Sequence, residues 1–439
     1  MPALAPSASA TQNLQLMSCP VRRLVLGFGA IGLLVSSVPV PGALAQWIPV
    51  TRDAENQAIA YSTTTPGDPV SVLQRTIDDG SARLSFDAGT GYLTSVLTAL
   101  DVPAASQALV FSKTSFQRDA ISASNPRALY FNSQVYVGWV PGAPMLEIAS
   151  VDPALGAIFY TLRQEDAAHP RFERHTRTCL QCHDSSSLTG GVPGLLMTSV
   201  HTGEGGAQIV ADGVHLTTDE SPMKERWGGW FVTGRTGGQP HMGADLITPL
   251  ESAAYPAGRQ SDVVALTLLA HQARLQNLMT RTGYHTRMAL FFDRQRNADL
   301  GRNGRDLLET TTQLIARVAE PLVEALLFSG ESALAAPIAG TSGFADAFSR
   351  QGPRDRTGRS LFELDLRHRT MRYPCSYMIY SASFDALPAP VKTQIYRRLS
   401  EVLRGTDTRA AFSHLTTADR SAVLEILRDT KPEFVGYAR

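Results

Sequence analysis

Short β-prone runs alternate with turn signals between residues 106 and 165. The runs begin at Ala128, Val135, Met145 and Ala157, and Asn-Ser, Pro-Gly-Ala-Pro and Asp-Pro-Ala-Leu-Gly separate them. Apolar and aromatic runs of this length with turn residues between them are typical of antiparallel strands that follow one another in a sheet. The pattern predicts an antiparallel meander in the first half of the chain.

From Ser261 onward the apolar positions follow a helical period. Residues 261–281 carry one continuous seam with steps of four, three, four and three residues, formed by Val264, Leu268, His271, Leu275 and Leu278. Positions spaced in this way lie on one face of an α-helix. We therefore expect a helix over 261–281 that packs this seam against the rest of the protein.

Three more helices are predicted towards the C-terminus, at about 305–329, 389–404 and 417–429. Pro321 would kink or restart the first of them, because proline lacks the N–H that the helix needs. Residues 331–388 show no regular period, and a connection of this length is usually functional or wraps a neighbouring element.

Strands first and helices afterwards predict an α+β fold. We expect an N-terminal antiparallel β-rich domain at 46–165, a loop-rich haem c segment at 166–258 and a C-terminal helical domain at 259–439, which contains the long loop 331–388.

The N-terminus resembles an export signal. Residues 22–45 begin with two arginines, continue with an apolar stretch and end in Ala-Leu-Ala, which fits the small-x-small rule of signal peptidase. The alternative is a membrane anchor, but the apolar stretch is shorter than a spanning helix and prolines interrupt it. We predict a cleaved signal peptide at 1–45, with translation starting at Met1 or Met17. The mature protein would be periplasmic or secreted, with no membrane span.

Composition and charge narrow the classes of function. The chain has 439 residues, 43% of them hydrophobic, with 40 basic and 40 acidic side chains. This hydrophobic content is enough for a folded core. A neutral chain with scattered charges lacks the basic stripe of nucleic-acid-binding proteins, so we expect no nucleic-acid partner.

One short motif points to specific chemistry. Residues 179–183 read Cys-Leu-Gln-Cys-His, which is the C-x-x-C-H attachment sequence of c-type haem. Cys179 and Cys182 would add to the two haem vinyl groups, and His183 would give its imidazole to the iron as the proximal ligand. The haem c maturation machinery that forms these bonds acts outside the cytoplasm, in agreement with the predicted signal peptide.

Two other uses of a cysteine pair fit the sequence less well. A zinc site needs a second pair of ligands, and the other cysteine after the signal peptide is the single Cys375. A thioredoxin-like dithiol stands between a strand and a helix, whereas polar, turn-rich segments flank this motif. The sequence therefore favours one covalent haem c, with the dithiol as the alternative.

Around this motif the chain resembles an exported bacterial family of single-haem, cytochrome c-like proteins whose function has no name. The segments that carry the resemblance lie within residues 105–400 and are LYFNSQVYVGWVPGAPMLEIASVDPALGAIFYTL, CLQCHDSSSLTGGVPG, ERWGGWFVTG with PHMG after it, DVVALTLLAHQARLQNLMTR and YPCSYMIYSASFDALP. The resemblance implies one protein with one attached haem, held by Cys179, Cys182 and His183. It implies no particular substrate.

The sixth iron ligand would decide the chemistry, because Met or His there gives an electron carrier and an open position lets iron bind a small molecule. His271 in the apolar seam and Met242 in a Gly- and Pro-rich loop are the alternatives for this ligand. Both residues could instead have an ordinary structural role. His271 could be a hydrogen-bonded histidine of the core, and Met242 could be a buried methionine of its loop.

Further residues could serve the iron site without being its sixth ligand. His241 could be a ligand or a distal acid–base group. Arg226, between Glu225 and Trp227, could pair with a haem propionate or polarise a bound substrate. His175, His201 and His215 stand in polar runs, so we do not expect them to bind iron.

Three functions remain open from the sequence. A haem-dependent oxidoreductase acting on a small molecule is favoured, because one haem needs far less protein than this for electron transfer alone, and a β-rich and a helical part can enclose a cavity. An electron-transfer protein that docks a redox partner is the alternative. A haem-based gas-binding or sensing module is the second alternative.

Overall fold

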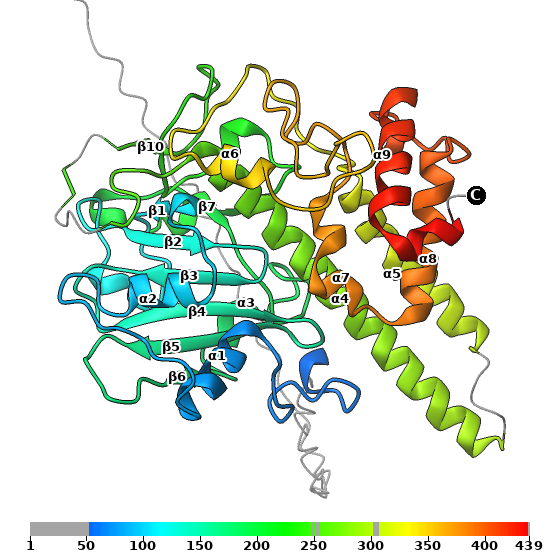
Figure 1. Ribbon diagram of the computed structural model, residues 1–439, viewed down its shortest axis with the longest axis horizontal. Coiled ribbons are helices and arrows are strands. Elements are labelled where there is room, and N and C mark those ends of the chain that lie inside the picture. Colours follow the sequence, from blue (N-terminus) through cyan, green and yellow to red (C-terminus); the bar gives the residue numbers. More distant parts are fainter. Residues whose placement is uncertain (1–51, 247–248, 251–254, 302–306, 438–439) are drawn as a thin grey trace, which may run out of the picture. The chain divides into compact units, whose positions relative to one another are not determined.

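In the computed structural model, an antiparallel sheet of six strands forms the first half of the described chain (Figure 1). The structure describes residues 52–246, 249–250, 255–301 and 307–437, so the predicted signal peptide at 1–45 lies outside them. Neighbouring strands in the sheet follow one another in sequence, as in a meander. The strands are β1 (Ala108–Val110), β2 (Arg127–Phe131), β3 (Val135–Trp139), β4 (Met145–Asp152), β5 (Gly156–Arg163) and β6 (Phe172–Arg174). The predicted meander and the α+β class are confirmed.

The two faces of this sheet are covered by different helices. Helix α1 (Pro69–Asp78) lies on the face of Ser150, whose hydroxyl accepts a hydrogen bond from the Val70 N–H at 3.3 Å. Tyr136 pairs with Ala149, the strand neighbour of Ser150, so it points to the opposite face. Its hydroxyl meets Gln272 of α4 (Val263–Asp299). Helix α2 (Leu93–Ala99) lies between α1 and β1 in the sequence and buries its apolar side chains in the same core.

Helix α4 is longer than the sequence predicts, because it runs on from 281 to Asp299. Its start is fixed by Asp262, whose carboxylate accepts hydrogen bonds from the Val264 and Ala265 N–H groups. Beyond 281 the apolar seam fades, and α5 (Glu309–Leu326) stabilises the helix instead. The Thr311 hydroxyl donates to Asp293 of α4 at 2.6 Å.

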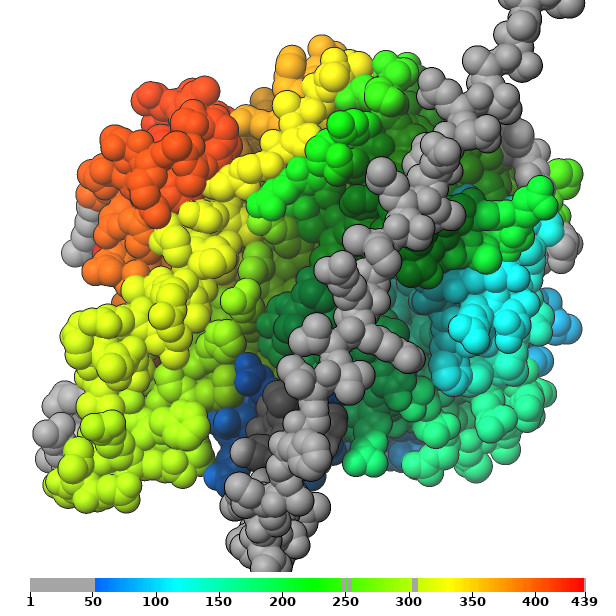
Figure 2. Space-filling model, turned by 180° about the vertical axis from the view of Figure 1, so that it is seen from behind, coloured from blue at the N-terminus to red at the C-terminus, as the bar shows by residue number. Residues whose placement is uncertain are grey.

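The remaining helices lie near the predicted positions. Helices α8 (Ala389–Leu403) and α9 (Thr417–Thr430) pack with α5 into a C-terminal bundle. Helix α5 continues through Pro321. The stretch 331–388 is mostly irregular and contains only α6 (Phe344–Ser349), a 3₁₀ turn at Tyr377–Tyr380 and α7 (Ala382–Asp385) among its helices. Figure 2 shows the face on which the C-terminal helices (orange and red) and the sheet (cyan) lie on either side of the green middle segments.

The middle of the chain is rich in loops, as predicted. Its regular elements are α3 (Leu180–His183), β7 (Thr198–Val200), β8 (Val214–Leu216), β9 (Phe231–Val232) and β10 (Ala244–Asp245). Other 3₁₀ turns lie at Asp53–Glu55, Ala104–Ser106, Arg118–Ala120, Glu204–Gly206, Val210–Asp212, Met223–Glu225, Ala410–Phe412 and Pro432–Tyr437. None of the helices in the described ranges is long and apolar enough to cross a membrane.

Sheet, loops and helices share one hydrophobic core. A single cluster of buried side chains runs from Tyr61 through the sheet and α4 to Phe434 near the C-terminus. Residues 50–439 accordingly form one compact unit. Side chains of the loop-rich segment belong to the same core and pack between the sheet and α4. The Cys-Leu-Gln-Cys-His motif lies in this segment.

Candidate haem-attachment site

The motif forms a single helical turn. The N–H groups of Cys182 and His183 donate to the carbonyl oxygen of Cys179 at 3.3 and 3.0 Å. Residues three apart in such a turn lie on the same side, so the two cysteine side chains are neighbours. Both thiols are free, with Cys182 exposed and Cys179 half-buried. The pair is therefore available to a ligand that approaches from solvent.

His183 is held by the backbone beside it. Its Nδ1 lies 2.9 Å from the carbonyl oxygen of Gly194, which can only accept, so Nδ1 carries the proton. The Gly194 N–H donates in return to the His183 carbonyl oxygen at 2.8 Å. Nε2 has no hydrogen-bond partner among the residues that the structure describes. Histidines that bind metals commonly donate their other ring N–H to a carbonyl in this way, which fixes the tautomer.

The segment that carries Gly194 is clamped by α4. Asn277 accepts from the Leu195 N–H at 2.7 Å and donates to the Leu195 carbonyl oxygen at 2.8 Å. A Cβ on Gly194 would lie 2.5 Å from Oδ1 of Asn277, so only glycine fits this close approach. Helix α4 thus fixes the carbonyl group that orients the His183 ring.

The sheet supplies charged groups to the same place. Arg127 of β2 and Glu147 of β4 form an ion pair with 3.4 Å between Nε and Oε2. Nε of Arg127 is buried and makes no hydrogen bond within the described chain. Burial, and after it the Glu147 charge and Cys182, raises the pKa of the Cys179 thiol to about 11. Burial is also the main cause that lowers the pKa of His183, which favours the neutral imidazole that a metal requires.

Two further side chains of this region come from β5 and the segment after it. The Phe159 ring packs on His183 with 4.6 Å between ring centroids. Thr161, two residues along the same strand face, lies 2.8 Å from Nε2 of His175. His175, for which the sequence analysis predicts no iron-binding role, is thereby brought close to the motif. The strand period could have shown that Glu147, Phe159 and Thr161 share a face in their hairpin, but not that the motif packs there.

The structure places His271 in the core and away from the motif. Its Nε2 lies 2.8 Å from Oγ of Ser376, its Nδ1 lies 3.4 Å from Asp219, and its ring stacks on Phe328. The residue of α4 that holds the stretch directly after the motif is Asn277, which lies six residues or about 9 Å further along the helix axis. Both ring nitrogens of His271 are engaged within the core.

The Ser376–His271–Asp219 chain has the order of a catalytic triad, but it is closed to substrate. The three residues are 0%, 1% and 3% exposed. The Ser376 hydroxyl also accepts from the Met378 N–H, as the cap of a 3₁₀ turn. A nucleophile must reach its substrate, so these hydrogen bonds serve to link α4 to the segments that pack on it.

The other predicted site residues gather around Trp227. Arg226 is buried and donates to the carbonyl oxygens of Ser221 and Asp219 at 2.8 and 2.9 Å. The Met242 N–H donates to the Arg226 carbonyl oxygen, and Sδ of Met242 lies 3.5 Å from the Ser199 hydroxyl. The ring of His241 packs edge-on against Trp227. The structure thus brings His241, Met242 and Arg226 together, and none of their contacts within the described ranges is with His183.

The residues around the motif fit a covalent haem c. The cysteine pair is free and faces solvent in part, and the histidine has one ring nitrogen fixed and one without a hydrogen bond in the described chain. The buried Nε of Arg127 makes no hydrogen bond there, although it lies in the ion pair with Glu147. Arg127 would suit a haem propionate, because a carboxylate accepts hydrogen bonds from a guanidinium with good geometry. Within the described ranges, the motif included, no group of three or more His, Cys, Asp or Glu side chains is placed to hold a metal ion.

Comparisons with family models, with curated proteins and with solved structures found no match to this chain.

Proposed function

We propose that this chain is an exported c-type monohaem protein that works as a haem-dependent oxidoreductase on a small molecule. Cys179 and Cys182 would hold the haem through thioether bonds, and His183 would be its proximal ligand. The observation that carries the proposal is the hydrogen bond from Nδ1 of His183 to the Gly194 carbonyl oxygen, since it leaves Nε2 available for iron.

A bound haem would supply redox-active iron, and the chain would supply charge and protons around it. Arg127 would neutralise a propionate or a developing negative charge. Glu147 and His175, which lie on the same side of the sheet, would be the groups that give or take a proton. These three residues replace His241 and Arg226 as the best candidates for such roles, because they lie beside the motif.

Electron transfer to a redox partner protein is the second candidate. It is favoured by the exposure of Cys182 and of Gln181 and Thr178 beside it, which would leave a haem edge at the surface where a partner can dock. The two candidates differ in whether the iron has a free coordination position.

Covalent attachment is tested first. The full chain is produced in a bacterial periplasm with the haem c maturation machinery and is stained for haem after denaturing electrophoresis. We expect one covalent haem, lost when Cys179 and Cys182 are both replaced by Ala and kept in Cys375→Ala. Absence of covalent haem in the unmodified chain would overturn the proposal and favour the dithiol.

Visible spectra then separate the two candidates. The holoprotein is measured oxidised, reduced, and reduced in the presence of carbon monoxide. A spectrum that changes with carbon monoxide would mean accessible iron and support the oxidoreductase, whereas a low-spin spectrum that does not respond would support the electron carrier.

A further inference from the structure

A large cavity opens at the end of the sheet formed by the β2–β3 turn. It has a volume of about 870 Å³ and lies between α1, that turn, α4 and the segment 344–381. Cavities of this size bury most of the surface of a small organic ligand. The long irregular stretch after α5 therefore forms one side of this cavity.

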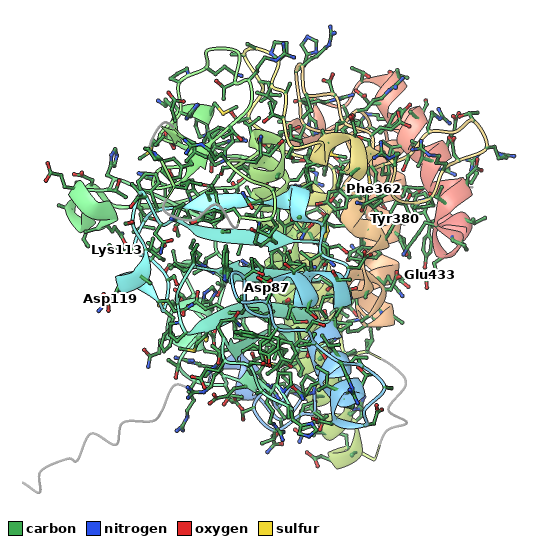
Figure 3. The ribbon with its side chains drawn as sticks, turned by 60° about the vertical axis from the view of Figure 1, so that its left-hand side comes forward. Asp87, Lys113, Asp119, Phe362, Tyr380 and Glu433 are labelled. Carbon is green, nitrogen blue, oxygen red and sulfur yellow. The ribbon has the colours of Figure 1, made fainter. Side chains whose placement is uncertain are left out.

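One side of the cavity is a continuous wall of aromatic rings. The members touch one another in sequence, with centroid distances from 4.8 Å for Phe348 and Tyr377 to 6.4 Å for Phe362 and Tyr380. Figure 3 labels Phe362 and Tyr380, which lie next to each other beside the C-terminal helices. The wall consists of Phe131, Phe344, Phe348, Phe362, Tyr377 and Tyr380. Four of these rings are only 2–5% exposed because they pack on one another, whereas Phe362 and Tyr380 are half-buried. A flat, apolar partner at stacked or edge-on geometry would therefore meet the wall mainly at Phe362 and Tyr380.

The polar groups of the cavity are almost all neutral. Its one charged lining residue within the described ranges is Asp101, which is exposed at the rim. Gln272 is buried at the base, where Tyr377 donates to its Oε1 at 2.9 Å. Gln134 and Gln351 line the cavity with side-chain amides that make no hydrogen bond to the described protein. Amides of this kind can pair with hydroxyl or carbonyl groups, whereas a buried anion would find no countercharge among the lining residues, and a cation would find only the exposed Asp101 at the rim.

We propose that this cavity is a binding site for an uncharged aromatic molecule that carries hydroxyl or carbonyl groups. The ring system would stack on the aromatic wall, and the polar substituents would meet the free amides of Gln134 and Gln351. The volume accommodates two or three linked or fused rings, by comparison with the size range of small-molecule sites of about 300–1,000 Å³.

This site is separate from the cysteine motif. None of the motif residues lines the cavity, and neither do Glu147 and Phe159, which surround the motif. The cavity proposal therefore does not depend on the haem. It can be tested in the Cys179→Ala/Cys182→Ala protein, in which haem cannot quench a fluorescent probe.

The probe is N-phenyl-1-naphthylamine, a neutral two-part aromatic compound whose fluorescence rises in apolar surroundings. We expect saturable binding to one site. Val72→Glu should weaken it at least tenfold, because Val72 lines the cavity and a carboxylate there would be desolvated by the ligand. Val72 is 44% exposed on a helix, so glutamate is compatible with the fold. The matched control is Val210→Glu, at a valine that is 76% exposed and outside the cavity.

Competition defines the ligand class. 2-Naphthol, which is neutral at pH 7, should displace the probe, and 2-naphthoate, which has the same rings and a negative charge, should need at least tenfold higher concentration. Non-saturable binding, or equal binding to the Val72→Glu and unmodified proteins, would overturn the site. Equal competition by the two naphthalenes would overturn the preference for an uncharged ligand.

Discussion

At the scale of single residues, the site combines a half-buried thiol with a nearby carboxylate. The pKa of Cys179 is raised to about 11 chiefly by burial and next by the negative charge of Glu147. Because a like charge disfavours the thiolate, removal of the Glu147 charge should lower this pKa. Glu147→Gln should therefore make the Cys179 thiol more reactive.

The reaction of the haem-free Cys182→Ala protein with iodoacetamide between pH 7 and 10 measures this change. Cys375 is fully buried with a pKa raised to about 12, so it contributes little. We expect faster alkylation in Glu147→Gln at each pH and an unchanged rate in the control Glu173→Gln, an exposed carboxylate on β6. A slower or unchanged reaction of Glu147→Gln would show that Glu147 does not act on the thiol.

Asn277 is a positioning residue at the same scale. Its amide makes two hydrogen bonds to the backbone of Leu195, and neutral hydrogen bonds contribute about 1 kcal/mol each to stability. Asn277→Ala should lower the free energy of unfolding by about 1–3 kcal/mol, measured by urea denaturation of the haem-free protein. Gln313→Ala, at an exposed amide of α5 that bonds only to Glu309, should change it by less than about 0.5 kcal/mol. Equal effects would contradict the role of Asn277.

At the scale of elements, the sequence predicts helices and strands well where the hydrophobic period and the capping residues agree. The strand runs and the seam from Val264 predicted the meander and the start of α4. Helix α1 was not predicted, although Asp68 caps it and Pro69 stands at its first position, which is a typical start signal. The end of α4 could not be read from the seam, because contacts such as Thr311 with Asp293 stabilise its last turns.

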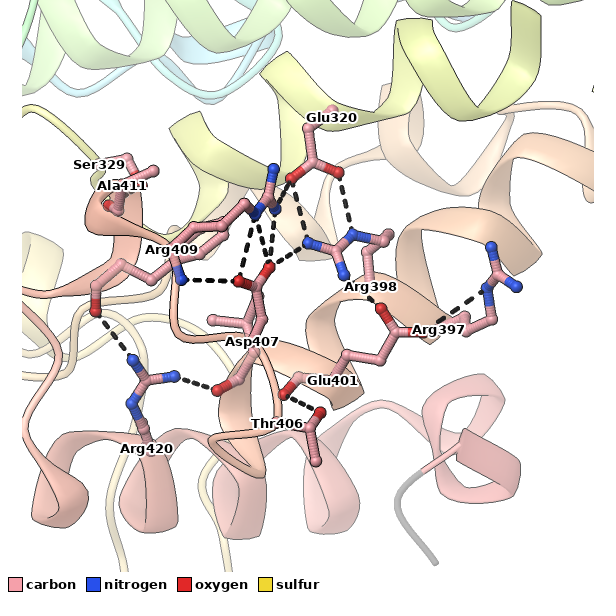
Figure 4. A network of polar contacts seen from close by, with 12 residues as sticks. Glu320, Ser329, Arg397, Arg398, Glu401, Thr406, Asp407, Arg409, Ala411 and Arg420 are labelled. Atoms are coloured by element: carbon pink, nitrogen blue, oxygen red, sulfur yellow. Dashed lines mark hydrogen bonds and ion pairs between the residues drawn. The ribbon is translucent and has the colours of Figure 1, made fainter. Parts of the chain in front are cut away.

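The C-terminal bundle is tied together by a network of ion pairs between α5, α8 and the loop after α8 (Figure 4). Glu320 pairs with Arg398 and Arg409, and both arginines also pair with Asp407. The pKa of Asp407 lies well below its usual range, first because Arg409 donates hydrogen bonds to it. A carboxyl whose pKa falls on folding stabilises the protein above the unfolded-state pKa, and this contribution is lost as the pH falls towards the folded-state pKa.

Asp407→Asn should therefore destabilise the protein at pH 7 and have a smaller effect in acid. We expect a loss of about 1–3 kcal/mol at pH 7, since the substitution removes one partner from the half-buried Arg398 and one from the exposed Arg409. Below about pH 4 the difference from the unmodified protein should shrink. Urea denaturation at pH 7 and pH 3 measures both values. Asp119→Asn, at a fully exposed carboxylate labelled in Figure 3, is the control. A loss of stability in Asp407→Asn that is larger at pH 3 than at pH 7 would contradict the expected pH dependence.

At the scale of the whole molecule, the candidate site could be predicted only in part. The proposed attachment residues Cys179, Cys182 and His183 follow from the motif alone, because haem attachment would use residues that are neighbours in the chain. The groups around it could not be found in this way. Arg127, Glu147 and Phe159 reach the motif through the packing of a distant sheet, and Gly194 is positioned by α4. Contacts of this kind depend on the tertiary fold.

The shared core has a consequence for the unfolding of the protein. The tryptophans that the structure describes, Trp139, Trp227 and Trp230, lie in the sheet and in the middle segment. The helices lie mainly in the C-terminal half, so circular dichroism at 222 nm reports on that half. If one core stabilises both the sheet and the C-terminal helices, loss of packing in the helices removes contacts that stabilise the sheet, and the reverse. Tryptophan fluorescence and circular dichroism should then give the same urea midpoint.

The test uses the haem-free protein with Trp47→Phe, so that the fluorescence comes from the three described tryptophans. Leu268→Ala, at a fully buried position of α4, should lower the stability by about 2–5 kcal/mol and move both midpoints together. A fluorescence transition that stays in place while the helical signal shifts would mean that the sheet and the helices unfold as separate domains. In that case α4 would lie between two separately stabilised cores.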